Sequence, residues 1–389
     1  MARLLAILTL ILMSVPALAG QQVDIYRAEA LVKSQQAGER ATAARAGLRE
    51  VMIRVSGDRE AVSNPVIAAA IGQAQNYLHE FSYASTDRQI EEEGVSRPAT
   101  LLIMKFSPAG VTRLLREAGL PLWPANRPKL MVWMISEDSE GAHHRVPDEA
   151  ALQAIYQQAG VRGVPLLFPL QDFEDNIALP SELLEALDEE AIATASERYQ
   201  PDAILAGRLQ QSAEGQWQSS WILMQGTEVH HLDGSGAGVG EQISSAIDFS
   251  ADRFAALYAI VPREGSSTPD AVTLQIDDVR NFADFKEVQR YFEAMAMVNH
   301  FELLQAQGSR LVVQLQIEGD LNLLVSTLEL GRKLVPVASV TVAAPLLPAP
   351  GATDPFRVDE PPTESGTAPA AAIIGTGSQD NPLGYRWAN

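Results

Sequence analysis

The fold of the central part of this chain is decided by the stretch at residues 201–209, which reads PDAILAGRL. Its apolar part, at 203–209, predicts a buried strand. Before it, from residue 181 onward, leucines and isoleucines recur at helical spacing, and after it two strand-like runs surround Gly226. A strand that lies between a helix and a hairpin in this way predicts a layered sheet with helices packed on it.

The same pattern extends over residues 126–262 and predicts a central α/β domain. Further strands are expected at 129–135 and 164–170, and Ser181 is the expected N-cap of the helix that precedes the PDAILAGRL strand. A long helix at 239–260 closes the domain. The expected element order is therefore β-α-β-α-β-β-β-α.

Two further domains flank the central one. Residues 20–125 predict an N-terminal α+β domain with the element order β-α-α-β-β-α. Residues 268–343 predict the order β-α-β-β-α-β of a ferredoxin-like domain, in which Pro336 suits a strand at the edge of the sheet. The expected fold class is therefore mixed α+β, with three small domains whose mixed sheets are covered by helices.

The last stretch, residues 344–389, is rich in Pro, Ala, Gly, Ser and Thr without an apolar period. This composition predicts a disordered C-terminal tail, because it cannot bury enough surface to offset its ordering entropy. Two interpretations of its end stay open. Tyr385, Arg386 and Trp387 form a short docking motif, since aromatic and Arg side chains anchor interfaces, or they share the disorder of the tail.

The first 19 residues have the three parts of a secretory signal peptide. Arg3 supplies positive charge, residues 4–15 are apolar, and Ala17-Leu18-Ala19 is a small-x-small signature, so cleavage is expected after Ala19. An uncleaved membrane anchor is the alternative, but an apolar run of this length falls short of the roughly 20 residues that span a bilayer. No later segment is a candidate span. The protein is therefore expected to be exported to a bacterial periplasm.

The composition excludes several classes of site. The chain of 389 residues has 29 Lys+Arg against 49 Asp+Glu and no cysteine, which gives a formal net charge of -20. Removal of the signal peptide takes away Arg3 and no acid, so the mature charge becomes -21. The absence of cysteine excludes disulfides, thiolate metal sites, a Cys nucleophile and an acylated lipoprotein cysteine. The acidic excess disfavours nucleic acid as a partner, because phosphate binding uses clustered Lys and Arg.

Several short motifs carry a family resemblance. They are the signal peptide, Val23-Asp24-Ile25-Tyr26, the Ala-rich helix that ends in Arg54-Val55-Ser56-Gly57, Arg127-Pro128-Lys129-Leu130, and residues 201–208. Over most of residues 20–340 the chain resembles a bacterial exported family, the domain of unknown function two thousand and sixty-six. That family has no assigned activity, so the resemblance implies no catalytic residue.

A looser resemblance concerns the pattern of the central domain. Residues 202–208 are similar to a strand motif of TolB amino-terminal and CsgG-like envelope domains. The first two domains in tandem also resemble the arrangement in flagellar assembly proteins of the FlgT type. This resemblance implies a part that assembles and interacts within the cell envelope, not an enzyme.

The histidines do not have the spacing of a metal site. They are His79, His143, His144, His230, His231 and His300. Adjacent residues on a strand point to opposite faces, so neither neighbouring pair supplies two ligands to one ion. A metal bound by both pairs together requires the hairpin at 227–232 to approach the loop after residue 135, which the sequence leaves open. We expect surface histidines and no metal site.

The remaining motifs do not match known catalytic patterns. The segment DGSGAGVG at 233–240 matches neither a dinucleotide fingerprint nor a P-loop, so we expect a flexible connector. The common serine hydrolase signatures are missing. Carboxylates that a glycosidase requires in pairs are present in three groups, for which we expect solvated or helix-capping roles. These groups are Glu91-Glu92-Glu93, Asp172 with Glu174 and Asp175, and Asp277-Asp278.

The acidic residues are concentrated at 171–202, which contains ten acids and Arg198 as its one basic residue. This region is either a negative face that steers a basic partner or a face adapted to solubility. The leading hypothesis is a periplasmic, non-enzymatic interaction or scaffold protein whose partners are other envelope proteins. No catalytic, cofactor-binding or metal-ligating residue is assigned. The alternatives are a carboxylate-based cell-wall hydrolase and a periplasmic carrier of a small ligand, and the oligomeric state stays open.

Overall fold

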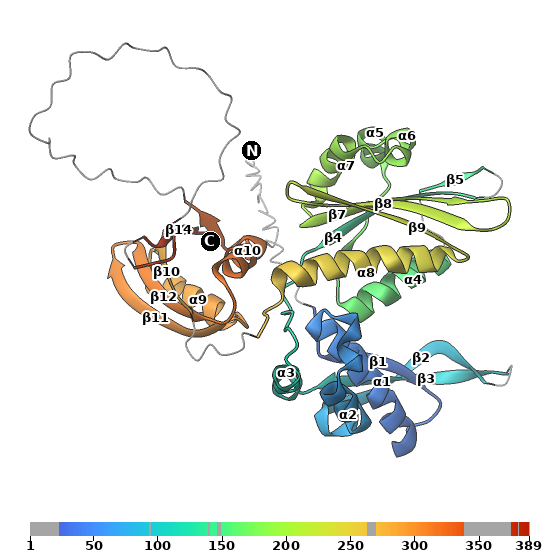
Figure 1. Cartoon of the computed structure of the whole chain (residues 1–389), viewed down its shortest axis with the longest axis horizontal. Coiled ribbons are helices and arrows are strands. Elements are labelled where there is room, and N and C mark those ends of the chain that lie inside the picture. Colours follow the sequence, from blue (N-terminus) through green and yellow to red (C-terminus); the bar gives the residue numbers. More distant parts are fainter. Residues whose placement is uncertain are drawn as a thin grey trace, which may run out of the picture. The chain divides into compact units, whose positions relative to one another are not determined.

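The computed structural model describes residues 23–92, 95–138, 141–145, 149–262, 270–337, 375–379 and 381–388. These residues form three sheets with helices, which confirms the mixed α+β class (Figure 1). The chain divides into two compact units, the first ending at Ala259 and the second beginning at Ile260. The first unit contains the N-terminal and central sheets. The expected signal peptide lies outside the described residues.

The N-terminal sheet is antiparallel, with strand order β1-β3-β2. Its strands are β1 (Arg27–Val32), β2 (Leu78–Glu92) and β3 (Val95–Phe106). The helices are α1 (Ala37–Ser56), α2 (Pro65–Gly72) and α3 (Pro108–Glu117), and 3-10 turns span Arg59–Ser63 and Ala74–Tyr77. The core forms where Leu48, Val51 and Met52 of α1 pack in one cluster with the apolar side chains of β3. Strand β1 is an edge strand among the described residues.

The central sheet is mixed, with strand order β5-β4-β7-β8-β9, and β6 pairs with β4. Its strands are β4 (Leu130–Glu137), β5 (His143–His144), β6 (Leu166–Leu167), β7 (Ala203–Gln211), β8 (Trp217–Gln225) and β9 (Glu228–Gly236). Strand β7, the predicted PDAILAGRL strand, runs parallel to β4 in the centre of the sheet. Gly207 on β7 lies directly against the ring of Trp221, where a Cβ atom would be 2.0 Å from a ring carbon.

Helices cover both faces of the central sheet (Figure 1). On one face α4 (Glu149–Arg162) and α8 (Val239–Tyr258) pack on Leu130, Val132 and Leu205. On the other face α5 (Phe173–Ala178), α6 (Ser181–Glu185) and α7 (Glu189–Ser196) cover Trp133 and Ala206. A layered sheet is what the alternation of helices and strands predicts.

Three local predictions for this domain are wrong. The single helix expected after Ser181 is divided into α6 and α7, because Leu187 adopts φ 52° and Asp188 caps α7 by accepting from the Ala191 N–H at 2.9 Å. Ser181 is the first residue of α6, not its cap, since the N-cap position is Pro180. The strand expected at 164–170 shortens to β6, which lies between two prolines that cannot donate to a strand ladder.

The sheet of the second unit has strand order β11-β12-β10-β14-β13. Its elements are β10 (Asp270–Asp277), α9 (Phe282–Glu293), β11 (Val298–Gln307), β12 (Arg310–Ile317), α10 (Leu321–Gly331), β13 (Leu334–Pro336) and β14 (Leu383–Trp387). The order β11-β12-β10 is that of a ferredoxin-like sheet. The place beside β10 is taken by β14, which runs parallel to β10, and β13 with Pro336 forms the edge. The ferredoxin-like prediction is thus corrected at its fourth strand.

The end of the chain is part of this core, which corrects the disorder predicted for all of residues 344–389. Tyr385 and Trp387 on β14 are buried, with exposed fractions of 0% and 4%. Both interpretations of this end, as a short docking motif and as disorder, are therefore wrong, because the strand pairs with β10 of the same chain. Residues 344–374 lie outside the described residues. Within the described residues, no helix combines the length and hydropathy needed to cross a membrane.

Candidate functional site

Three buried arginines connect the N-terminal and central domains, and we call Arg54, Arg127 and Arg162 the arginine core. The Arg127 guanidinium stacks 3.7 Å from the centroid of the Trp123 ring. Its Nη2 donates to the carbonyl oxygen of Arg54 at 2.7 Å, and its Nη1 donates to that of Arg162 at 2.8 Å. Burial, together with the charges of the other two arginines, holds the pKa of Arg127 well below its ordinary value. Main-chain carbonyl dipoles stabilise this charge, since no carboxylate pairs with it among the described residues.

Arg162 and Arg54 extend the network to three helices. Arg162 donates from Nη1 to Asp248 at 2.8 Å and from Nη2 to Asp252 at 2.6 Å, both on α8. It also donates to the carbonyl oxygen of Gly57 at 2.8 Å, at the end of α1. Arg54 donates from Nε to the carbonyl oxygen of Gly160 on α4 at 2.7 Å. The arginine core therefore holds α1 against α4 and α8.

Gly163, just after α4, allows the side chains of Arg54 and Arg127 to lie close to the main chain at this turn. Its φ is 68°, in the left-handed region that side chains other than glycine rarely adopt. A Cβ atom at this position would lie 2.6 Å from Cγ of Arg54 and 2.9 Å from Nη1 of Arg127. The turn after α4 thus requires glycine for both its backbone and its neighbours.

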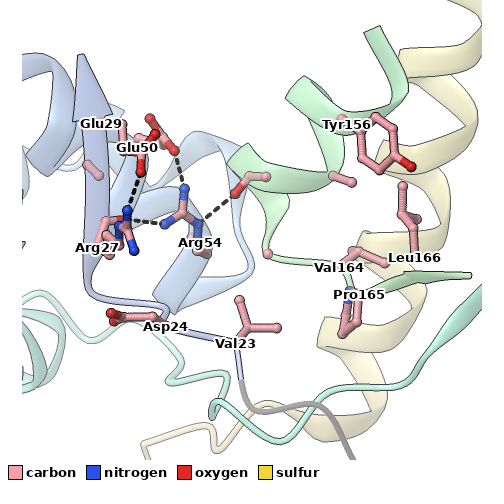
Figure 2. Close-up of a pocket in the computed structure, with 14 residues that line it drawn as sticks. Val23, Asp24, Arg27, Glu29, Glu50, Arg54, Tyr156, Val164, Pro165 and Leu166 are labelled. Carbon is pink, nitrogen blue, oxygen red and sulfur yellow. Dashed lines mark hydrogen bonds and ion pairs between the residues drawn. The ribbon is translucent and has the colours of Figure 1, made fainter. Parts of the chain in front are cut away.

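An open groove of about 680 Å³ lies beside the arginine core, between the two domains (Figure 2). One wall is charged and comes from the N-terminal domain, with Arg27 and Glu29 of β1 and Glu50 and Arg54 of α1. The opposite wall is mostly apolar and comes from the central domain. It consists of Tyr156, Ala159, Gly160, Gly163, Val164, Pro165 and Leu166, and Val23 and Asp24 lie at the groove's end.

The charged wall is internally paired. Arg27 Nη2 donates to Glu29 at 2.5 Å, and the Arg54 guanidinium contacts Glu50 as an ion pair. Arg54 Nη1 also donates to the carbonyl oxygen of Arg27 at 2.5 Å. The groove therefore presents ion pairs and not two free carboxylates that face one another.

The backbone of β1 offers a second kind of contact. Phe106 N–H donates to the carbonyl oxygen of Tyr26 at 2.9 Å, and Ala28 lies opposite Met104 in the antiparallel register. Because hydrogen-bonded pairs alternate along such a ladder, the N–H and C=O groups of Glu29 and Leu31 point to the edge away from β3. No strand among the described residues pairs with that edge.

The predicted carboxylate group at 172–175 forms a network that is only partly solvated. Asp172 caps α5 by accepting from the Asp175 N–H at 3.0 Å, as the capping prediction states. Asp175 is fully buried, so its predicted solvated role is wrong. It accepts from the Tyr199 hydroxyl at 2.7 Å and from Arg198 Nη1 at 3.0 Å. Burial and the hydrogen bond to Asp175 raise the pKa of the Tyr199 hydroxyl.

This network gives a testable dependence on pH. The hydrogen bond from Arg198 is the main cause that lowers the pKa of Asp172 from 3.8 to about 2. A lowered folded-state pKa gives stability that is complete above the unfolded-state pKa and is lost as the pH falls toward the folded-state value. We expect Asp172→Asn to lower the Tm at neutral pH and to flatten the fall of the Tm between about pH 4 and about pH 2. Glu174→Gln, at a more exposed partner of Arg198, is the control, and an unchanged acid slope in Asp172→Asn would contradict the prediction.

The histidines lie at the surface, as predicted. His143 and His144 are exposed on β5, where they pair with Glu185 at 3.0 Å and Asp138 at 2.9 Å. His230 and His231 lie on β9, at the opposite edge of the central sheet. The two pairs therefore do not meet. No group of three or more potential metal ligands occurs among the described residues.

The other two predicted carboxylate groups belong to different units of the chain. Asp277 pairs with Arg310 at 2.7 Å in the second unit, and the exposed Glu91 lies on β2.

The segment at 233–240, for which a flexible connector is expected, belongs to strand β9 as far as Gly236 and to helix α8 from Val239. Gly234 lies so close to Gln242 that a Cβ atom would be 2.3 Å from Gln242 Oε1. Close packing against α8, and not flexibility, accounts for the glycines of β9.

Sequence reasoning missed the arginine core and the groove. Arg54 and Arg127 both lie in motifs that carry the family resemblance, but neither was assigned a role. A usable signal was present, since Arg54 follows the buried Gly47 and Val51 at helical spacing along α1. Burial of a guanidinium requires hydrogen-bond acceptors, which the carbonyl oxygens of Gly160 and Arg27 supply to Arg54.

One family model is similar to the N-terminal part of the chain. Residues 19–124 match a family described as a domain of unknown function (DUF8605). No curated protein sequence matches the chain. This match agrees with the predicted resemblance in kind, because both name a domain of unknown function. The family numbered two thousand and sixty-six, and the resemblance beyond residue 124, stay predictions.

Two solved structures are distantly similar. One is a competence or damage-inducible protein from Enterobacter asburiae, with 14% identity, 38% of this chain and 93% of that chain covered, and a TM-score of 0.20. The other is an uncharacterized protein, with 8% identity, 34% of this chain and 88% of that chain covered, and a TM-score of 0.14. At these TM-scores neither likeness defines the fold or a function.

Proposed function

We propose that this chain is a non-enzymatic interaction protein of the bacterial cell envelope. It binds an extended segment of a partner protein in the groove between its first two domains. The observation that carries the proposal is the open edge of β1, which runs along the charged wall of that groove. The expected signal peptide and the resemblance to TolB amino-terminal, CsgG-like and FlgT-type envelope domains support the periplasmic location.

The mode of binding follows from the two kinds of wall. An extended segment that adds to β1 bonds to the N–H and C=O groups of Glu29 and Leu31, as in strand addition at other sheet edges. Its side chains alternate, so that one set meets Arg27 and Glu29 while the other meets the apolar wall at Val164 and Leu166. A groove of about 680 Å³ is within the usual size of a ligand site.

The substitution Glu29→Pro tests this mode of binding. Proline at this position removes the N–H that faces the open edge, but it removes no hydrogen bond to β3. Glu29→Ala is the matched control, because it removes the same carboxylate and keeps the N–H. We expect a photoreactive side chain at Leu166, on the opposite wall, to form one recurrent adduct in intact cells. That adduct persists in Glu29→Ala and is lost in Glu29→Pro, while the Tm values of the two variants stay close.

The same adduct at equal yield in both variants would contradict binding by strand addition. The hydrolase alternative is tested separately, by incubating the purified chain with peptidoglycan. If the chain releases wall fragments and the release is lost when Glu50 or Glu29 is substituted, the chain is a hydrolase and the proposal is wrong. The ion pairs of both carboxylates support the non-enzymatic interpretation.

A further inference from the structure

Helix α5 of the central domain exposes apolar side chains and buries a carboxylate, which is the reverse of an ordinary amphipathic surface helix. Its Phe173 is 81% exposed and its Ile177 is 62% exposed, whereas its Asp175 is completely buried. Leu170, just before the helix, is 70% exposed as well. Hydration of these apolar side chains is unfavourable, and burial of a carboxylate is unfavourable as well.

The inverted orientation is fixed by polar contacts beneath the helix. The Tyr199 hydroxyl bonds to Asp175 and accepts from the Leu170 N–H at 2.9 Å. Arg145 Nη1 donates to the carbonyl oxygen of Leu179 at 2.7 Å, just after the helix. Since both ends of α5 are held, Phe173 and Ile177 are kept exposed and do not fold back into the core.

Phe173 and Ile177 are four residues apart, so they lie next to each other on one face of α5. We call Leu170, Phe173 and Ile177 the α5 patch. A contiguous apolar surface of this kind is typical of a protein or membrane contact.

The charge around the α5 patch selects between these two partners. The side chains of Asp172 and Glu174 at the patch are 40% and 72% exposed. They belong to the acidic region at 171–202, whose one arginine, Arg198, is already engaged by these acids and by Asp175. Such a surface repels anionic lipid headgroups and attracts Lys and Arg side chains.

We propose that the α5 patch is a docking surface for a partner protein segment in which apolar side chains are flanked by Lys or Arg. The apolar side chains cover Phe173 and Ile177, and the basic ones approach Glu174. This site is separate from the groove along β1, so it does not depend on the function proposed for that groove. It gives the acidic region a role in recognition beyond solubility.

Two labelled helical peptides test the proposal directly with the whole chain. Both have the same leucine positions, but one carries lysines and the other glutamates at the remaining positions. We expect fluorescence anisotropy to show saturable binding of the lysine peptide alone, with an affinity that falls as the salt concentration rises. Phe173→Ser combined with Ile177→Ser should weaken this binding roughly tenfold or more, since exposed apolar anchors carry much of the energy of such contacts.

Phe282→Ser is the matched control, because Phe282 is 71% exposed and lies in the second unit. It should leave the binding unchanged, and all variants should keep the Tm of the parent because the replaced side chains are exposed. Equal binding of both peptides, or binding unaffected by the double substitution, would overturn the proposal. Stronger binding to phosphatidylglycerol vesicles than to the lysine peptide would assign the patch to a membrane instead.

A photoreactive residue at position 173 tests the partner's chemistry in cells. We expect mass spectrometry to identify one recurrent cross-linked segment that carries Lys or Arg within a few residues of an apolar side chain. A recurrent segment that is acidic or uncharged, or adducts without any recurrent segment, would contradict the proposed partner.

Discussion

Arg127→Met is expected to lower the free energy of unfolding of the first unit by about 4 kcal/mol. The reason lies in the acceptors of the guanidinium. They are the carbonyl oxygens of Arg54 in the N-terminal domain, of Arg162 in the central domain, and of Trp123 and Pro124 in the segment between them. A methionine fills much of the space but donates no hydrogen bond, so buried carbonyl oxygens lose their partner.

Replacement of buried charges by apolar side chains is often neutral when both members of an ion pair are removed together. That result does not apply to Arg127, because its acceptors are main-chain groups that no substitution removes. Arg127→Lys should also be strongly destabilising, since one ammonium group cannot reproduce the planar set of donors or the stacking on Trp123.

Urea titration followed by tryptophan fluorescence measures this effect. Of the five tryptophans, Trp387 alone belongs to the second unit, so the signal reports mainly the first unit. Arg59→Met is the matched control. Arg59 contacts the same two aspartates of α8 as Arg162, at 3.5 and 3.0 Å, but its side chain is 54% exposed. The control should cost less than about 1 kcal/mol. A cost below 1 kcal/mol for Arg127→Met as well would show that the arginine core does not hold the two domains together.

The parts of the fold that were predictable are those that local patterns determine. The central strand β7 was predicted because an apolar run between polar segments has few other solutions. The break between α6 and α7 was missed, since Leu187 continues the apolar period and only the cap at Asp188 ends it. The role of Asp175 was missed for a similar reason. A carboxylate beside other carboxylates is typical of a solvated surface, and its partner Tyr199 lies 24 residues away.

The candidate site was less predictable than the fold, because its chemistry comes from the main chain. The acceptors of Arg127 are carbonyl oxygens, which every residue has, so no pattern of side chains identifies them. The open edge of β1 is likewise a property of strand order. That order depends on pairing between β1 and β3, which are separated by more than 60 residues of sequence.

Removal of the last strand is expected to have the second large effect. A chain that ends at residue 374 lacks β14, which separates β10 from β13 and is the sheet partner of β13. It also loses Leu383, Tyr385 and Trp387, which alternate inward along the strand and are buried. Loss of a buried aromatic side chain costs about 3–5 kcal/mol, so the removal of two is comparable to the whole stability of a small domain, about 5–15 kcal/mol.

The packing of β14 indicates how completely it belongs to this core. The ring of Trp387 meets that of Tyr291 on α9 edge to face, at a centroid distance of 5.8 Å. Burial, with a smaller contribution from Glu329, raises the pKa of Tyr385 to about 12. The main-chain groups of β10 that face β14 lose their partners in the shortened chain, and they are then open to exchange with water.

Hydrogen exchange over residues 270–277 measures this loss on β10. We expect protection there to fall roughly a thousandfold in the chain that ends at residue 374. A synthetic peptide of residues 375–389 added in trans should restore protection. The same peptide with Arg386→Ser should restore it as well, because Arg386 points outward, whereas Tyr385→Ser should not. Unchanged protection of β10 in the shortened chain would mean that β14 adds to a sheet that is already stable without it. Equal rescue by both peptide variants would mean that main-chain pairing alone holds the strand, because Tyr385 would then contribute nothing that serine does not.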